Sequence, residues 1–367
     1  MFFHNSAFSK ELANPRRILI IRLGVIGEVI HTVPLLVALR TRFPKAEIAW
    51  LIDDKTAKLL LDHWAIDRLV IVQKDKKDIG TSTSEMLRVL NRLRAFAPDV
   101  TIDTQGNFLS AFAAWISGAK HRIGFGNRRG SWLNNHRIIP DAVHTIDQNM
   151  QLLKPVGVFG SSIDFDMPEC EMDRCSARNI LNYKGLHGNF AILNVGAGWK
   201  SKLWKEERYG LIAKYLLEQW NLPSLVVWGR DDEESMAENV VHVSEDAAVK
   251  APPISLGELA SISRLATLFI GSDTGPLHIA AAAGTRCIGL YGPNSALRDG
   301  PYGIQNRSIQ VQHYEGTHLR LDRIPQTFMD AIDTELVCDV CDEILTDILR
   351  PSTMPMTQPS EPMKKAA

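Results

Sequence analysis

The sequence contains no uninterrupted apolar run of about 18 residues, the length that a membrane-spanning helix requires. Neither charge is in excess, because 41 Lys and Arg residues stand against 42 Asp and Glu residues, a formal net charge of −1. This balance removes the electrostatic reason to expect nucleic acid as a partner. The first residues also lack the basic and apolar segments of a secretory signal peptide. We therefore expect a cytoplasmic protein, with peripheral contact with a membrane left open.

Cysteine is scarce, with 5 residues in a chain of 367. Cys338 and Cys341 have the spacing of a CxxC pair, but no second pair and no cluster of histidines follows them. A structural zinc site needs four such ligands, so we expect no metal site here and interpret the pair as small residues of one helix. An odd number of loosely spaced cysteines fits a reducing compartment.

The glycine fingerprints of common nucleotide loops are also missing, since neither half of the chain has GxGxxG after its first strand-like segment. This argues against a nicotinamide-dependent dehydrogenase. Apolar strand-like segments nevertheless alternate with helix-like segments, a pattern that predicts βαβ units around a parallel sheet. The alternation fades after residue 157 and restarts at Phe190.

We therefore predict an α/β protein with two Rossmann-like, doubly wound domains that face a shared cleft. The predicted domains are residues 1–168 and residues 169–330, followed by a helix at 331–350. The tail, residues 351–367, is rich in Pro, Ser, Thr and Met and is expected to be disordered. In open α/β sheets, ligands bind beyond the carboxyl ends of the strands, so the informative residues should follow strands.

The strongest such stretch is "SDTGPLH", where a strand ends and a helix begins at once. The N-terminus of a helix is a ready site for phosphate, and Thr274 and Gly275 could place N–H donors there. Asp273 precedes this turn and His278 lies on the first helical turn. The alternative is that Asp273 and Thr274 only cap the helix.

Two further stretches follow predicted strands of the second domain. In "GAGWKSK", Gly198 allows close approach of the backbone to an anion and Lys202 supplies charge; the alternative is a glycine turn with solvated lysines. Glu233 lies where the next helix begins, so it could accept a hydrogen bond from a ribose or sugar hydroxyl. It could equally be an acidic residue that favours a helix N-terminus without any ligand.

The first domain opens with "RLGVIGEVIHTVP", which places Glu28 between apolar neighbours. An apolar environment destabilises the charged form of a carboxylate and favours proton uptake near neutral pH, as a general base requires. The alternative is an ordinary helix acid beside a buried His31. The other residues that follow strands, and could line the opposite wall of the cleft, are Gln105, Asn107, Arg128 and Arg129. The two arginines could instead be a solvated pair.

Taken in order, "RLGVIGEVIHTVP", "DTQG", "NVGAGWKSKLWKEERYG" and "IGSDTGPLHIAAAAG" resemble segments of the lipopolysaccharide heptosyltransferases, glycosyltransferase family 9. The resemblance runs from Arg17 to about Leu349. This sequence departs from the usual family pattern at Glu28, where relatives commonly have Asp. It also departs at Leu109, where they often have a lysine that suits an acidic acceptor.

The resemblance implies the GT-B fold, with an N-terminal acceptor domain, a C-terminal nucleotide-sugar domain and a late helix that often packs back on the first domain. It implies an inverting transfer of a sugar, usually from ADP-heptose, to a lipid-linked or core saccharide acceptor. We expect no cofactor, because a helix N-terminus and a lysine would stabilise the leaving ADP without requiring a metal. The implied roles are a base for Glu28, diphosphate binding for Lys202, Thr274 and Gly275, donor contacts for Gly198 and Glu233, and donor orientation for Asp273 and His278. The alternatives are another nucleotide sugar, a surface-glycan acceptor, or a non-catalytic relative that only binds sugar nucleotides.

Overall fold

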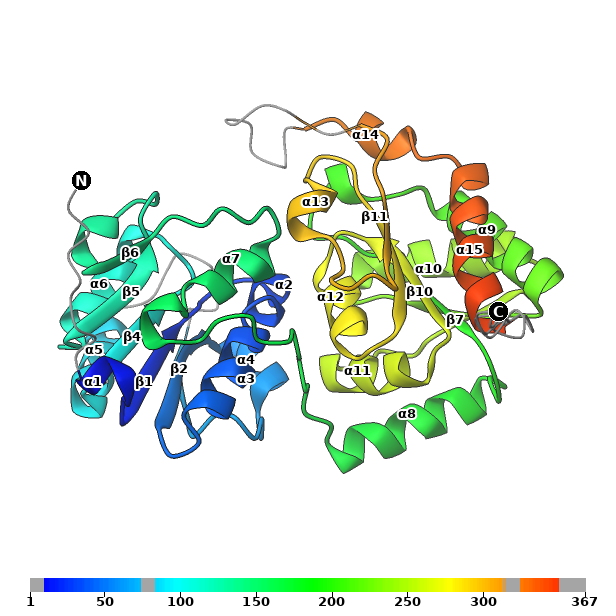
Figure 1. The fold of residues 1–367 in the computed structure, drawn as a ribbon. Helices are drawn as coiled ribbons and strands as arrows, with labels where there is room; N and C mark the ends of the chain where they lie inside the picture. Colours follow the sequence, from blue (N-terminus) through cyan, green and yellow to red (C-terminus); the bar gives the residue numbers. More distant parts are fainter. Residues whose placement is uncertain (1–9, 74–82, 313, 315–323, 350–367) are drawn as a thin grey trace, which may run out of the picture.

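The computed structural model describes residues 10–73, 83–312, 314 and 324–349 and contains two parallel sheets of six strands each (Figure 1). The α/β prediction with two doubly wound units is confirmed. The predicted tail at residues 351–367 lies outside the described residues. No helix in the part of the chain that the structure describes is both long and apolar enough to span a bilayer.

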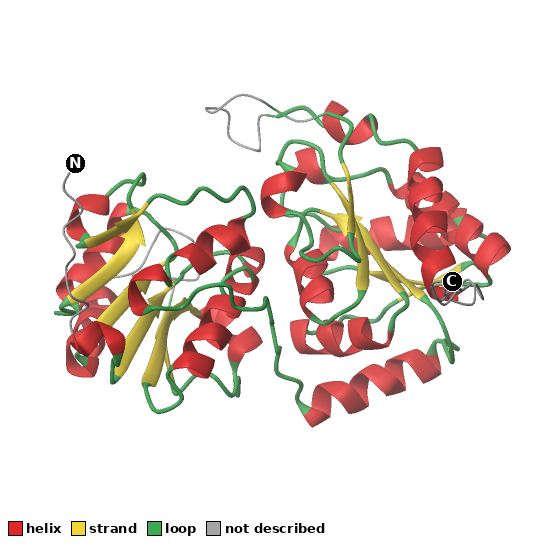
Figure 2. Ribbon diagram, in the orientation of Figure 1, coloured by secondary structure: helices red, strands yellow, loops and turns green. Residues whose placement is uncertain are grey.

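The first sheet has the strand order β3-β2-β1-β4-β5-β6. Helices cover both of its faces, and the side chains of the central strand alternate between them (Figure 2). Leu19 and Ile21 pack with α5 (Thr83–Phe96) and α6 (Phe108–Ile116), whereas Ile18 and Ile20 pack with α2 (Ile26–Ile30) and α3 (Val33–Arg42). Its strands are β1 (Arg17–Ile21), β2 (Glu47–Asp53), β3 (Arg68–Val72), β4 (Val100–Asp103), β5 (His121–Phe125) and β6 (His136–Ile138).

The helices of the first unit are mostly short. They are α1 (Lys10–Ala13), α2 (Ile26–Ile30), α3 (Val33–Arg42), α4 (Asp54–Ala57), η1 (Lys58–Leu60), α5 (Thr83–Phe96), α6 (Phe108–Ile116), η2 (Ser131–Leu133), α7 (Thr145–Gln151) and η3 (Lys154–Val156). The sequence predicts one helix over Val29–Arg42, but the structure divides this segment at His31 and Thr32. Pro34 explains the break, because proline cannot donate to the carbonyl of Ile30 and its ring crowds that group.

The second sheet has the strand order β12-β11-β10-β7-β8-β9. Its strands are β7 (Ala191–Asn194), β8 (Ser224–Val227), β9 (Ala248–Lys250), β10 (Leu268–Ser272), β11 (Arg286–Leu290) and β12 (Arg307–Ile309). Its helices are α8 (Glu171–Tyr183), η4 (Lys200–Lys202), α9 (Glu206–Trp220), α10 (Asp231–Val243), α11 (Leu256–Leu265), α12 (Gly275–Ala282), α13 (Ala296–Asp299), α14 (Thr327–Asp330) and α15 (Thr334–Leu349). Helix α8 packs on α11, and the predicted boundary at 168 falls in the irregular segment before α8.

Within the described residues, the late helix α15 packs on the second unit and not on the first, which corrects the expectation from the family resemblance. It lies against α9 of the second unit (Figure 1), and Val337, Cys341 and Leu345 are buried in the core there. The loop before it is held by the same unit, because the Trp204 indole N–H donates to the carbonyl of Ile332 at 2.9 Å.

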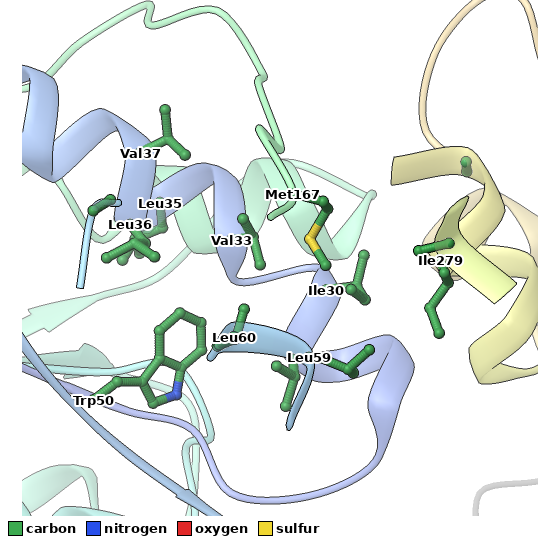
Figure 3. Packing of buried hydrophobic residues seen from close by; sticks show 14 of the residues in the cluster. Ile30, Val33, Leu35, Leu36, Val37, Trp50, Leu59, Leu60, Met167 and Ile279 are labelled. Atoms are coloured by element: carbon green, nitrogen blue, oxygen red, sulfur yellow. The ribbon is translucent and has the colours of Figure 1, made fainter. Parts of the chain in front are cut away.

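The apolar core continues from one unit into the other. Ile30, Leu59 and Met167 belong to the same buried cluster as Ile279 of α12, which faces them across the junction in Figure 3. Helix α2 also packs directly on α12. The two strand-end regions are therefore held facing each other by shared packing.

Candidate active site

A cleft of about 530 Å³ lies where the two units face each other. The first unit contributes the segments that follow β1, β4 and β5, together with α7. The second unit contributes η4, the turn between β10 and α12, and the segment that follows β11. The lining residues include Arg22, Glu28, His31, Gln105 and Arg128 from the first unit, and Gly198, Lys202, Asp273, Thr274, Gly275, His278, Asn294 and Arg298 from the second.

Asp273 is the centre of a buried polar cluster in the second unit. Its Oδ2 accepts hydrogen bonds from Lys202 Nζ and Asn294 Nδ2, both at 2.7 Å, while His278 Nε2 lies 3.4 Å from Oδ1. Burial alone would raise the pKa of this carboxyl, but hydrogen bonding to His278 and the charge of Lys202 hold the pKa well below its usual value. The carboxylate therefore stays ionised and fixes the Lys202 ammonium at the edge of the cleft.

Helix α12 begins at this cluster without a side-chain cap. Thr274 occupies the N-cap position, but its hydroxyl donates to the carbonyl of Ser272 at 3.2 Å rather than accepting from the helix. The interpretation that Asp273 and Thr274 serve only as caps is therefore wrong. The first N–H groups of α12 lie beside the Lys202 ammonium, an arrangement that favours a bound anion.

Glu28 lies on α2 and is not enclosed by apolar side chains, which corrects the environment expected from the sequence. Its side chain is 48% exposed, and Oε2 pairs with Arg22 Nη2 at 3.0 Å. Arg22 is itself buried and donates from Nη1 to the carbonyl of Thr104 at 2.6 Å. Gly24, whose φ is +130°, leaves space for the carboxylate, because a Cβ there would lie 2.8 Å from Oε2.

A pair of histidines joins the two walls of the cleft. His31 Nε2 of the first unit lies 3.2 Å from His278 Nδ1 of the second. Burial lowers the pKa of His31 well below its ordinary value, and the neighbouring His278, His144 and Arg22 lower it further. His31 is thus neutral, and the contact extends the Asp273 cluster to the base of α2. Gly27 is required beside this contact, because a Cβ there would lie 2.6 Å from His278 Cδ2.

A second set of contacts joins the units at α7. Thr145 Oγ1 donates to Asp299 Oδ1 at 2.7 Å, and the Tyr302 hydroxyl donates to Asp147 Oδ1 at 2.8 Å. His144 Nε2 lies 3.0 Å from the carbonyl of Gly300. These contacts, with those between α2 and α12, fix the position of the two walls relative to each other.

Comparison of the sequence with protein families identifies the family of the protein that forms this cleft. A family model described as glycosyltransferase family 9 (heptosyltransferase) matches residues 86–324. The chain belongs to glycosyltransferase family 9. The resemblance found in the sequence motifs is confirmed, and so is the expectation of a glycosyltransferase.

Curated relatives of this glycosyltransferase match along most of their length. Lipopolysaccharide heptosyltransferase 1 of Pseudomonas aeruginosa is 26% identical over 298 residues, which cover 78% of this chain and 81% of that protein. The lipopolysaccharide core heptosyltransferase OpsX of Haemophilus influenzae is 24% identical over 304 residues, covering 81% and 85% of the two chains.

Solved structures support the GT-B fold. A family 9 glycosyltransferase from Veillonella parvula superposes with a TM-score of 0.74 at 23% identity, covering 91% of this chain and 98% of that one. The Escherichia coli heptosyltransferase WaaC with ADP-2-deoxy-2-fluoro heptose gives a TM-score of 0.70 at 21% identity, covering 89% and 99%.

Most of the residues predicted for the family 9 site line the cleft, but three do not. Glu233 is buried under Gly229, where its Oε2 accepts from the Gly229 and Arg230 N–H groups at 2.9 and 3.2 Å. The carboxylate thereby closes the first turn of α10, and its role as a donor ligand remains a prediction. Asn107 caps α6, with Oδ1 accepting from the Ser110 N–H at 2.9 Å. Arg129 is exposed next to the cleft but does not line it.

Sequence reasoning missed several polar residues of the cleft. Arg22 directly follows β1 and Asn294 follows β11, so both occupy the strand-end positions where ligands gather. Thr145, Arg298 and Asp299 lie on short helices that no strand pattern marks. Gln105, which was predicted, reaches the cleft because its Oε1 accepts from the Leu23 N–H at 2.7 Å.

Proposed function

We propose that this glycosyltransferase moves a heptose from ADP-heptose to a lipopolysaccharide core acceptor, with inversion at the anomeric carbon. The observation that carries the proposal is that two different sets of charged groups line opposite walls of one cleft. An ion-paired carboxylate, Glu28, lines it from the first unit, and the Lys202–Asp273 cluster lines it from the second. The names of the lipopolysaccharide heptosyltransferases among the curated relatives support heptose and a lipopolysaccharide acceptor, and the WaaC structure with ADP-2-deoxy-2-fluoro heptose supports ADP as the nucleotide of the donor.

The acceptor reacts at the wall of the first unit. Glu28 takes the proton of an acceptor hydroxyl, and the oxygen forms a bond to the anomeric carbon of the donor. The bond from that carbon to the ADP oxygen breaks at the same time, and its electron pair leaves with ADP. A single displacement of this kind inverts the anomeric configuration. Arg22 orients the Glu28 carboxylate, since its guanidinium is fixed in turn by the carbonyl of Thr104.

The leaving group is stabilised at the wall of the second unit. Negative charge develops on the diphosphate as the bond breaks, and Lys202 with the N–H groups at the start of α12 would face it. Asp273 fixes Lys202, and His278 fixes Asp273. Because these donors are already in place, little reorganisation is needed as the charge appears.

We also propose that the transfer requires no divalent ion, because an ammonium and a helix N-terminus already supply the positive charge. The rate of ADP release is expected to be the same with EDTA as without it. A loss of rate in EDTA that Mg²⁺ restores would contradict this part of the proposal.

We further propose that the protein works at the cytoplasmic face of the inner membrane, where a lipid-linked acceptor is presented to it. Contact with both partners across one cleft suits such a location, because the donor is soluble and the acceptor is held in the bilayer.

The decisive experiment is transfer from ADP-heptose to a heptose-free lipopolysaccharide core. We expect ADP release that depends on the acceptor, a product heavier by one heptose, and an inverted anomeric centre by NMR. A thermal-shift titration with ADP, UDP and GDP tests the base of the donor, and stabilisation is expected with ADP. Absence of transfer together with absence of ADP binding would refute the proposed function.

A further inference from the structure

An exposed apolar face lies on α6 and η2, on the side of the cleft predicted to receive the acceptor. We call it the α6 face and define it as Phe108, Leu109, Phe112, Trp115 and Trp132. Leu109, Trp115 and Trp132 are 63%, 51% and 65% exposed, and together they form one apolar patch rather than scattered single residues. The rings form a continuous row, because the centroids from Phe108 to Phe112, Phe112 to Trp115 and Phe108 to Trp132 are 5.8 to 6.4 Å apart.

The segment that carries the α6 face has a charge unlike that of the chain as a whole. Residues 104–140 contain five Lys or Arg residues and no Asp or Glu, whereas the chain has a net charge of −1. Among the described residues, no carboxylate pairs with the exposed guanidinium groups of Arg128, Arg129 or Arg137. Arg137 lies beside the α6 face, since its Nη2 donates to the carbonyl of Trp132 at 3.3 Å.

The α6 face is continuous with the lip of the cleft. Gly130 packs so closely on the start of α6 that a Cβ there would lie 2.8 Å from Phe108 Cα. Arg128, two residues earlier, lines the cleft, and its side chain rests against Gly106 of the loop before α6. The loops after β4 and β5 therefore form one surface that leads from the aromatic row into the cleft.

We infer that the α6 face, with Arg128, Arg129 and Arg137, is the surface by which this protein docks on an anionic lipid bilayer. Tryptophan partitions into the headgroup region of a bilayer, where its apolar ring and its polar indole N–H are both satisfied. Phenylalanine and leucine add apolar area that is buried at the boundary with the acyl chains. Unpaired arginines add attraction to anionic headgroups. The inference rests on the proposed lipid-linked acceptor, because the docked surface ends at the wall of the cleft that would receive it.

Binding to vesicles tests the docking surface without any need for activity. The full chain is sedimented with vesicles of phosphatidylcholine alone and of equimolar phosphatidylcholine and phosphatidylglycerol, and we expect binding to the second only. Replacing both tryptophans, as in Trp115→Gln with Trp132→Gln, should weaken this binding at least about tenfold, since two large apolar surfaces no longer insert. Arg129→Gln with Arg137→Gln should weaken it about fivefold per charge removed.

Matched variants control for general effects on the surface. Phe159→Gln removes an aromatic ring that is 68% exposed but lies outside residues 104–140, and Lys45→Gln removes a similarly exposed charge. Both should bind the anionic vesicles as the wild type does. Thermal unfolding with and without ADP verifies that each variant is folded.

Transfer to two forms of one acceptor separates this inference from the proposed function. The double tryptophan variant should match the wild type on a delipidated, water-soluble core saccharide and be slower on the same core embedded in vesicles. If the wild type transfers to neither form, the proposed function fails, and vesicle binding alone decides the docking surface. Absence of wild-type binding to anionic vesicles would overturn the inference, as would equal binding by the double tryptophan variant. It would also be overturned if the only effect of the two tryptophan replacements were to convert a dimer to a monomer in analytical ultracentrifugation. The α6 face would then be a contact between two copies of this chain.

Discussion

Glu28 holds its carboxylate at a distance from α2 that an aspartate cannot reach. Replacement by aspartate withdraws the carboxylate by about one C–C bond, 1.5 Å. The 3.0 Å separation from Arg22 Nη2 would then become about 4.5 Å, which breaks the ion pair that orients the group. Misplacement of a reacting group by about 1 Å can cost ~100-fold in rate, so we expect Glu28→Asp to lower kcat about 100-fold.

Glu28→Gln tests the ability of residue 28 to take a proton without changing the position of its side-chain group. The amide keeps the length of the side chain and can still accept a hydrogen bond from Arg22, but it cannot take the proton of the acceptor hydroxyl. General base catalysis contributes about 100- to 10,000-fold, so kcat should fall by an amount in this range. The affinity for ADP should not change in either variant, because the predicted diphosphate site lies on the other unit.

The assay measures kcat and KM from acceptor-dependent ADP release, with ADP affinity from calorimetry. Glu47→Asp is the matched control, because Glu47 also pairs with an arginine at 3.0 Å but lies where β2 begins and does not line the cleft. It should leave kcat unchanged. Transfer by Glu28→Asp within threefold of the wild type would show that Arg22 does not set the position of the base. Retained transfer by Glu28→Gln would remove Glu28 from the base role.

Three further predictions concern the opposite wall, a helix cap and the histidine contact. Lys202→Met should lower kcat at least about 100-fold and weaken ADP binding measured by calorimetry, because developing charge loses its ammonium partner; unchanged ADP affinity would argue against a diphosphate site there. Glu233→Ala should lower the free energy of unfolding by about 1 kcal/mol in urea titrations without donor, since α10 loses its first-turn acceptor. An unchanged midpoint would contradict the capping role. Stability should also fall as the pH drops below 6.5, the ordinary pKa of histidine, because the unfolded chain protonates His31 there while the folded chain holds it neutral. His31→Gln should weaken this dependence, and the same slope in variant and wild type would refute the assignment.

The two sheets were predictable from the sequence, but three of their four edge strands were not. The strands that the sequence predicts are apolar runs followed by turns, whereas β6, β9 and β12 are three residues long and lie at or next to an open edge. Such strands bury few side chains, so they leave no period of two in the sequence. Their pairing is determined by the neighbouring strand rather than by their own residues.

The environment of Glu28 shows why the site was only partly predictable. Its sequence neighbours are apolar, but adjacent residues on a helix point in different directions, so they say little about what surrounds a side chain. Its actual partner is Arg22, whose orientation depends on a backbone carbonyl 82 residues away. The surface on which α15 packs could not be predicted either, because an amphipathic pattern shows that one helix face is buried but does not show what covers it.

The apolar cluster that passes from Ile30 and Met167 to Ile279 has a thermodynamic consequence. Units that share a core cannot lose their packing one at a time without exposing the side chains of the other. We expect a single endotherm in calorimetry, displaced as a whole when ADP occupies the second unit alone. Chimeras that exchange one unit between members of the family would therefore need their junction side chains exchanged together with it.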